Sequence, residues 1–172
     1  LRQHEVMSKS FKIQQSIRSG SESSMQRYMD LVLGQRSLRK LLVYELVIMV
    51  SAKRSGALGL WLRKKMFPWI MGEVGSNVIF GSNITLRHPH KIRIGNDVLI
   101  DENVMLDAKG DDNRGIDLAD GVFVGRNTTL CCKGGDISLG FRTNIGFNCN
   151  LATTSSIRLG AYNIIAAYSY IV

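Results

Sequence analysis

The sequence predicts an all-β fold of stacked three-sided coils, a parallel β-helix, with an α-helical N-terminal extension in front of it. Three observations support this prediction. Apolar residues recur every six positions from residue 74 onward, a helical apolar period precedes them, and only 4 of the 17 glycines lie in residues 1–70. We therefore expect two parts, a basic helical extension in residues 1–72 and a β-helix of five coils in residues 73–172.

The extension is expected to contain four helical segments, which we place at residues 3–18, 25–33, 37–53 and 58–70. The first two should end near Gly20 and Gly34, because glycine commonly follows the last residue of a helix. A Ser-rich stretch marks the start of the second segment. The third segment has the clearest helical pattern, and the fourth alternates apolar residues, two tryptophans among them, with basic ones.

The positive charge of the chain belongs to the extension. There are 22 Lys and Arg against 14 Asp and Glu, a net charge of +8 that first suggests a nucleic acid or a membrane surface as partner. Residues 1–70 hold 13 basic and 4 acidic side chains, whereas residues 71–172 hold 9 and 10. No motif that reads RNA or DNA accompanies the charge, so we expect no nucleic-acid partner.

Residues 58–70 leave two interpretations open. Their hydrophobic and basic alternation fits peripheral contact with a membrane surface. The alternative is a helix that packs on the open first coil and covers the edge at Val74, and different faces of the segment would serve both purposes. A transmembrane helix is not expected, because the longest apolar stretch, residues 41–50, includes Glu45 and falls short of the about twenty apolar residues required.

The cysteines and the first residues favour a cytoplasmic location. Cys131, Cys132 and Cys149 lack the CxxC spacing of a zinc site, and an odd number of cysteines does not predict a disulfide framework. No secretory signal is visible in the first residues. A reducing compartment is therefore expected.

The six-residue period forms five triplets of apolar residues. Successive triplets start 20, 24, 21 and 20 residues apart, which is 18 plus 2, 6, 3 and 2, so every extra residue falls at the same corner of a coil. The interior positions are Val74, Phe80 and Leu86; Ile94, Ile100 and Leu106; Leu118, Val124 and Leu130; Leu139, Ile145 and Leu151; and Leu159, Ile165 and Ile171.

Two further positions follow the same period. The fourth residue after each interior position is nearly always small or β-branched, as expected where a side chain packs in a narrower space. The residue directly after the interior position is glycine seven times. A side chain there would crowd the neighbouring coil, which lies about 4.8 Å away. These glycines are Gly75, Gly81, Gly95, Gly125, Gly140, Gly146 and Gly160.

The hexapeptides VGSNVI-FGSNIT, IGNDVL-IDENVM and IGFNCN follow the pattern [LIV]-[GAED]-x-x-[STAV]-x, from which FGSNIT departs at Phe80 and Ile84 and IGFNCN at Cys149. In these motifs residues 74–172 resemble the hexapeptide-repeat acyltransferases, and residues 86–110 are similar to the first coils of sugar O-acetyltransferases. The resemblance implies a left-handed parallel β-helix, against the usual right-handed rule for parallel strands, and a homotrimer.

This resemblance also implies an activity. A histidine general base would help a hydroxyl of a sugar or glycolipid to attack the thioester of acetyl-CoA or another acyl-CoA, without a metal. The base is expected beyond Val172, so that the chain as given is expected to be truncated and inactive. His88 and His90 are expected at a corner of the fold rather than in catalysis. The competing hypothesis is a non-catalytic β-helix that serves as a scaffold or oligomerisation module.

Two residues are predicted to bind substrate. The resemblance places Asn148 in the acceptor site, although Asn83, Asn103 and Asn127 share its position in earlier coils and point to a structural use of asparagine at the turn. Asp107 opens the longest corner insertion, a plausible substrate loop. It also shares a coil position with Arg87, and we expect the two to pair.

Four aromatic residues of the last two coils are expected to point outward, where they would form a subunit interface or the wall of a cleft. They are Phe141, Phe147, Tyr162 and Tyr168. A metal site of the β-helix hydratase type is not expected, because residues 91–172 contain no histidine.

Overall fold

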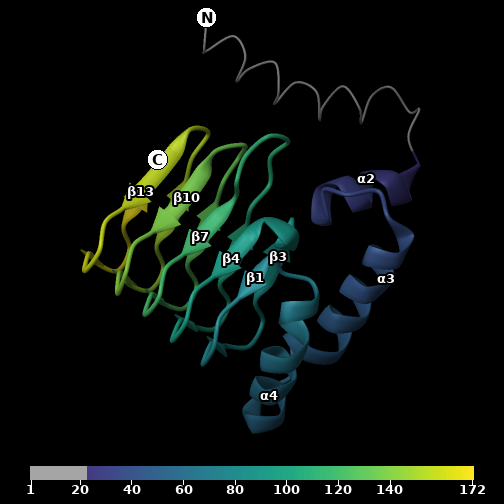
Figure 1. Ribbon diagram of the computed structural model, residues 1–172, viewed down its shortest axis with the longest axis horizontal. Helices are drawn as coiled ribbons and strands as arrows, with labels where there is room; N and C mark the ends of the chain where they lie inside the picture. The colour runs from purple at the N-terminus through teal and green to yellow at the C-terminus, as the bar shows by residue number, and fades with distance from the viewer. Residues whose placement is uncertain (1–22) are drawn as a thin grey trace, which may run out of the picture.

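The computed structural model describes residues 23–172, in which a group of helices is followed by a tapering stack of β-coils (Figure 1). The helix expected at residues 3–18 lies outside the described residues. The helical elements are α2 (Ser24–Val32), α3 (Leu38–Val47), the π-helical turn η1 (Ile48–Ala52), α4 (Gly56–Met66) and the 3₁₀ turn η2 (Phe67–Trp69). They confirm the other three helical segments to within a few residues, and Gly34 follows α2 with a φ of +65°.

The strands form three parallel sheets of five strands each, one sheet for each side of the coils. The first sheet contains β1 (Glu73–Val74), β4 (Ile92–Ile94), β7 (Ile116–Leu118), β10 (Asp136–Leu139) and β13 (Ser156–Leu159). The second contains β2 (Ile79–Phe80), β5 (Leu99–Ile100), β8 (Phe123–Val124), β11 (Asn144–Ile145) and β14 (Ile164–Ile165). The third contains β3 (Thr85–Arg87), β6 (Met105–Asp107), β9 (Thr129–Cys131), β12 (Asn150–Ala152) and β15 (Tyr170–Ile171), and a 3₁₀ turn, η3 (Pro89–Lys91), follows β3.

The register of these sheets confirms the sequence repeat. In the first sheet Val74 pairs with Ile94, Ile94 with Leu118, and the pairing continues through Leu139 to Leu159. The interior positions of the other two sheets pair in the same way, from Phe80 to Ile165 and from Leu86 to Ile171. The molecule is a left-handed parallel β-helix with an α-helical N-terminal extension, as the repeat and the family resemblance predict.

The interior of the coils is a continuous apolar core. The interior residues of the second, third and fourth coils are at most 2% exposed, and residues at the narrower position, such as Val104 and Thr128, are fully buried. The glycines reflect the close approach of the next coil. A Cβ on Gly125 would lie 2.7 Å from the carbonyl carbon of Gly146, whereas one on Gly160, in the last coil, would meet only the Asn163 amide nitrogen at 3.5 Å.

Asparagines at the corners adopt a left-handed backbone, which asparagine tolerates better than most residues. Asn83 and Asn103 both have a φ of 58°, and the Nδ2 of Asn83 donates to the Oδ1 of Asn103 over 2.8 Å. At another corner, Asn77 Nδ2 donates to Asp97 Oδ1 over the same distance. Side-chain hydrogen bonds between neighbouring coils therefore support the backbone ladders.

The helices lie against the first coil, at the opposite end of the stack from β13 (Figure 1). Arg63 Nε donates to Phe80 O over 2.9 Å, and Tyr44 Oη donates to Leu86 O over 2.8 Å. The amide of Asn83 donates to the carbonyl of Ala52, and that of His88 to the carbonyl of Val32, each over 2.7 Å. Backbone groups at the outer edge of the first coil are thus paired, and residues 58–70 pack on this coil as expected, although Arg63 contacts Phe80 rather than the edge at Val74.

Replacing Ile100 with Asp tests the register of the core. Ile100 is fully buried between Phe80 and Val124 in the second sheet. An unpaired carboxylate there should lower the free energy of unfolding by several kcal/mol, whereas Ile100→Val should cost only about 1 kcal/mol. Urea denaturation followed by circular dichroism measures both, and a midpoint for Ile100→Asp equal to that of the unmodified protein would refute the register.

Candidate functional site

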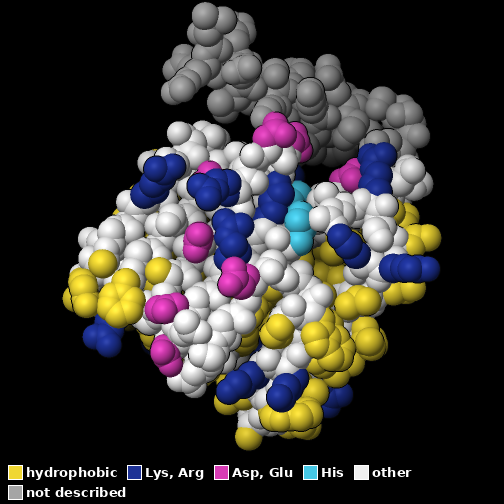
Figure 2. Space-filling model, in the orientation of Figure 1, with side chains coloured by type: hydrophobic (Ala, Val, Ile, Leu, Met, Phe, Trp, Pro, Cys, Tyr) yellow, Lys and Arg dark blue, Asp and Glu magenta, His cyan; other side chains and the backbone are white. Residues whose placement is uncertain are grey.

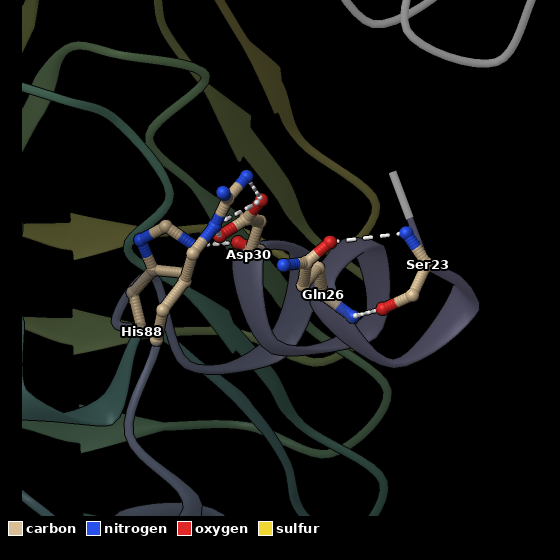
Figure 3. A network of polar contacts seen from close by, with 5 residues as sticks. Ser23, Gln26, Asp30 and His88 are labelled. Atoms are coloured by element: carbon tan, nitrogen blue, oxygen red, sulfur yellow. Dashed lines mark hydrogen bonds and ion pairs between the residues drawn. The ribbon is translucent and has the colours of Figure 1, made fainter. Parts of the chain in front are cut away.

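His88 occupies the first corner of the β-helix, between β3 and η3, where its φ is 49°. Figure 3 shows its ring facing α2, where Nε2 lies 2.9 Å from the backbone oxygen of Asp30. Because that oxygen only accepts, Nε2 carries the proton and Nδ1 holds the lone pair. Nδ1 is buried and has no hydrogen-bond partner among residues 23–172, and a Cβ added to Gly34 would lie 2.4 Å from it.

The helix that holds this ring is itself fixed at its N-terminus (Figure 3). Ser23 and Gln26 form a capping box, in which each side chain accepts a hydrogen bond from the other residue's backbone amide. The carboxylate of Asp30 pairs with Arg36, whose Nη2 lies 2.7 Å from Oδ2. The contact between Asp30 and His88 therefore joins a capped helix to the first corner.

Both corner histidines are poor general bases. Burial lowers the pKa of His88, and burial together with the neighbouring His88 and Lys91 lowers the pKa of His90 to about 4. A base is most effective when its pKa lies near the working pH, and the lone pair of His88 is out of reach of a substrate. The structure places both histidines at the corner, as expected, with their rings stacked 6.1 Å apart.

Asp107 lies at the end of β6 and is 5% exposed. It is in register with Arg87, and its Oδ2 lies 3.6 Å from Arg87 Nη1, which confirms the expected pair. Its Oδ1 accepts a hydrogen bond from the amide of Lys109 at 3.1 Å. Both carboxylate oxygens are therefore engaged within the protein.

The corner insertion after Asp107 is held by its neighbours. Lys91 Nζ donates to the carbonyl of Gly110 at 2.7 Å and to Asn113 Oδ1 at 2.9 Å. Asn113 Nδ2 in turn donates to the carbonyl of Gly135 at 2.8 Å. These contacts link three successive corners, so the insertion is a tied loop on the rigid stack.

Asn148 lies at a different corner, between β11 and β12, with a φ of 56° and a half-buried side chain. Its amide donates to the carbonyl of Arg126, one coil below, at 2.9 Å. In the third sheet Asp107 pairs with Cys131, and Cys131 pairs with Ala152, so Ala152 lies two coils above Asp107. Ala152 comes four residues after Asn148. Four residues of strand span about 13 Å and two coils about 10 Å, so the two predicted substrate residues are not brought together.

The outward aromatic residues form two columns, one at the corner of Asn148 and one at the corner between β10 and β11. Phe147 meets Tyr168 edge to face, with ring centroids 5.5 Å apart, and Phe141 meets Tyr162 in the same way. The guanidinium carbon of Arg126 lies 5.1 Å from the centre of the Phe147 ring, and that of Arg142 the same distance from Phe141. The sequence analysis did not identify these arginines, although Arg126 and Phe147 occupy the same position of the repeat in successive coils.

A shallow groove on the first sheet is lined mainly by acidic side chains, in contrast to the arginines of the columns. Its lining includes Glu73, Arg93, Asp117, Asp120 and Phe141, and Arg93 already lies 3.7 Å from the Asp117 carboxylate. Three carboxylates against one arginine disfavour a phosphate-bearing ligand. The groove is therefore mainly acidic, although Phe141 at its margin also belongs to one of the two columns.

Metal and thiol chemistry receive little support from the described part of the chain. Within residues 23–172 no group of three or more His, Cys, Asp or Glu side chains is placed to hold a metal ion. Cys131, Cys132 and Cys149 are free thiols, and burial raises the pKa of Cys132 to about 12. A thiol with so high a pKa is not a nucleophile near neutral pH.

Comparison with known proteins gives a weak likeness among solved structures. No protein-family model matches the sequence, and no curated protein matches it. Among solved structures, the chain is similar to serine acetyltransferase isoform 3 from Entamoeba histolytica in complex with cysteine, at 14% identity and a TM-score of 0.24. The match covers 77% of this chain and 44% of that one, so this chain spans less than half of its length. A likeness this weak carries no argument about activity.

The buried corner histidines predict a pH-dependent stability. The pKa of His90 is about 4 in the folded protein and about 6.5 in an unfolded chain, so between these values the unfolded state binds more protons. The contribution of His90 to stability is complete above about pH 6.5 and is lost progressively as the pH falls towards 4.

Comparing the free energy of unfolding of the unmodified protein with that of His90→Gln measures this contribution, because the carboxylates titrate in both proteins. As the pH falls from 7 to 4, the free energy of unfolding of the unmodified protein should fall by more than that of His90→Gln. A difference that stays constant over this range would show that His90 titrates as it does in water.

Proposed function

We propose that the protein is an acyltransferase that moves an acyl group, such as acetyl, from acyl-CoA to a hydroxyl of a sugar or glycolipid. The observation that supports this most is the hexapeptide pattern, whose fifteen interior positions all pair in register across five coils. The pattern is therefore one continuous structural repeat, as it is in the acyltransferases that the sequence resembles. When bound, the coenzyme would supply the acyl group as a thioester.

The surface around Asn148 supports the two substrates proposed. The guanidinium group of Arg126 can bind phosphate oxygens in a forked geometry, and the Phe147 ring offers a face on which a base can stack. The amide of Asn148 can accept from and donate to a sugar hydroxyl next to these groups. We assign acceptor binding to Asn148, and we propose that Asp107 acts indirectly, by fixing the loop that follows it.

We propose that the general base lies beyond Val172. The buried lone pair of His88 and the low pKa of His90 leave neither suited to deprotonate a hydroxyl near neutral pH. We also propose a homotrimer in which the aromatic columns, with Tyr162 66% and Tyr168 73% exposed, line the contact between subunits. The three free thiols support a cytoplasmic location for this assembly.

A scaffold without catalysis is the second candidate function. It is favoured by two polar groups at successive corners, the Asp107 carboxylate and His88 Nε2, because both are hydrogen-bonded within the protein. In that case the exposed aromatic columns would serve association only. The two candidates differ in whether any acyl-CoA is consumed.

Release of coenzyme A from acetyl-CoA, measured with a panel of sugars, tests the proposal. The protein encoded by the complete reading frame should release coenzyme A with at least one acceptor, whereas residues 1–172 alone should not. Asn148→Ala should lower kcat/KM for that acceptor by about tenfold, the effect of one lost hydrogen bond. Asn127→Ala is the matched control, because Asn127 has the same left-handed backbone one coil earlier.

Two outcomes would overturn this account. If the complete protein releases no coenzyme A with any acceptor, the scaffold function is favoured instead. If residues 1–172 alone turn over rapidly, the general base lies within them, and its proposed place beyond Val172 is wrong.

A further inference from the structure

The side of α4 that faces away from the β-helix combines an aromatic ring with two cations. Arg63, which is 1% exposed, turns towards the first coil. Trp61, on the opposite side of the helix, is 57% exposed. Lys64 and Lys65 follow it by three and four residues, which places both on the surface beside the ring.

The outer side of α3 is apolar. Leu41, Tyr44 and Val47 of this helix are buried against the rest of the protein. Leu42, on the other side of α3, is 70% exposed, and Met49, in the following turn η1, is 75% exposed. Figure 2 shows hydrophobic side chains gathered over α3 and α4, with Lys and Arg among them. We call this surface the helical outer face; its apolar members are Leu38, Leu42, Leu46, Met49, Leu58, Leu60, Trp61 and Trp69.

The charge of the helical outer face is nearly all positive. In residues 37–72 the only acidic residue is Glu45, and its Oε1 accepts a hydrogen bond from the hydroxyl of Tyr28 at 2.5 Å. Six basic residues of this segment are exposed: Arg39, Lys40, Lys53, Arg54, Lys64 and Lys65. A partner that covers this face must therefore accept apolar side chains and also carry negative charge.

We propose that the helical outer face binds the surface of an anionic lipid bilayer. Tryptophan and the long stems of lysine and arginine are suited to the boundary between acyl chains and head groups, and the cations would contact anionic head groups. The contact is peripheral, because no helix of residues 23–172 has the length and hydrophobicity needed to cross a bilayer. This inference is independent of the proposed acyl transfer.

Charge also distinguishes this partner from a second copy of the chain. Two copies that meet through this same face would bring Lys64 and Lys65 of each copy into an interface that carries the same positive charge on both sides, and like charges oppose that arrangement. An anionic bilayer supplies the opposite charge over the whole face. The β-helix would then project away from the lipid, because the helices cover only its first coil (Figure 1).

Sedimentation with vesicles tests the proposal. The full chain should pellet with vesicles of phosphatidylcholine and phosphatidylglycerol, but not with phosphatidylcholine alone, and less so in high salt, since ions screen charges beyond about 10 Å at 0.1 M. The emission of Trp61 and Trp69, the two tryptophans of the chain, should shift to the blue on binding.

Charge reversal gives a matched pair of variants. Lys64→Glu with Lys65→Glu should weaken the apparent affinity by about 30-fold or more. Lys133→Glu with Arg158→Glu changes the net charge equally at exposed positions of the β-helix, away from the helices, and should weaken binding by less than about threefold. Leu42→Ser with Met49→Ser removes apolar side chains only and should also weaken binding. Circular dichroism checks that each variant is folded.

Several results would overturn the proposal. They are the absence of pelleting, equal binding to neutral vesicles, salt-independent binding, or an equal loss in the two charge-reversed variants. The face would instead join two copies of the chain if two results were found together. The protein would not bind vesicles, and replacing Leu42 and Met49 would dissociate a dimer in sedimentation velocity.

Discussion

The open edge of the first coil is the constraint on which the rest of this structure depends. A β-helix ends in strands whose outward amides and carbonyls have no further strand to pair with, and such edges associate with other chains unless they are covered. Here Arg63 donates to Phe80 O and to the carbonyls of Ser51 and Arg54, while Tyr44 donates to Leu86 O. A fully buried guanidinium is stable only because carbonyl oxygens surround it in this way.

Once the first coil is fixed, each later coil is placed by the one before it. The interior residues stack in register, and the short corners leave little freedom except where residues are inserted after the third sheet. The chain thereby separates its surfaces. The basic, apolar helical outer face lies at one end, while the arginine–aromatic columns and Asn148 belong to the last three coils.

The sequence predicted the β-helix well because its repeat is local. Each interior residue, such as Ile100, is specified by a six-residue period that survives every corner insertion. The pairing of Arg87 with Asp107 followed from the same period. The helical segments were also found, although residues 37–53 form α3 and then a π-helical turn rather than one regular helix.

The contacts between the two parts of the chain were not predictable in the same way. Nothing near Arg63 in the sequence indicates that its side chain is buried against Phe80, 17 residues later. The hydrogen bond between His88 and Asp30 joins residues 58 positions apart. Such contacts depend on how the helices dock, whereas hydrophobic periodicity describes each element by itself. The repeat could have predicted that Arg126 lies beside Phe147. An exposed arginine, however, does not by itself indicate such a contact.

Chemical unfolding followed by two probes tests the central claim, that the helices and the β-helix form one cooperative unit joined at the first coil. Trp61 and Trp69 both lie in the helical part, so tryptophan fluorescence reports the extension alone, while circular dichroism at the β-sheet minimum reports mainly the coils. The account predicts that both signals change at the same urea concentration. A fluorescence transition completed at lower urea, with the β-sheet signal intact, would contradict it.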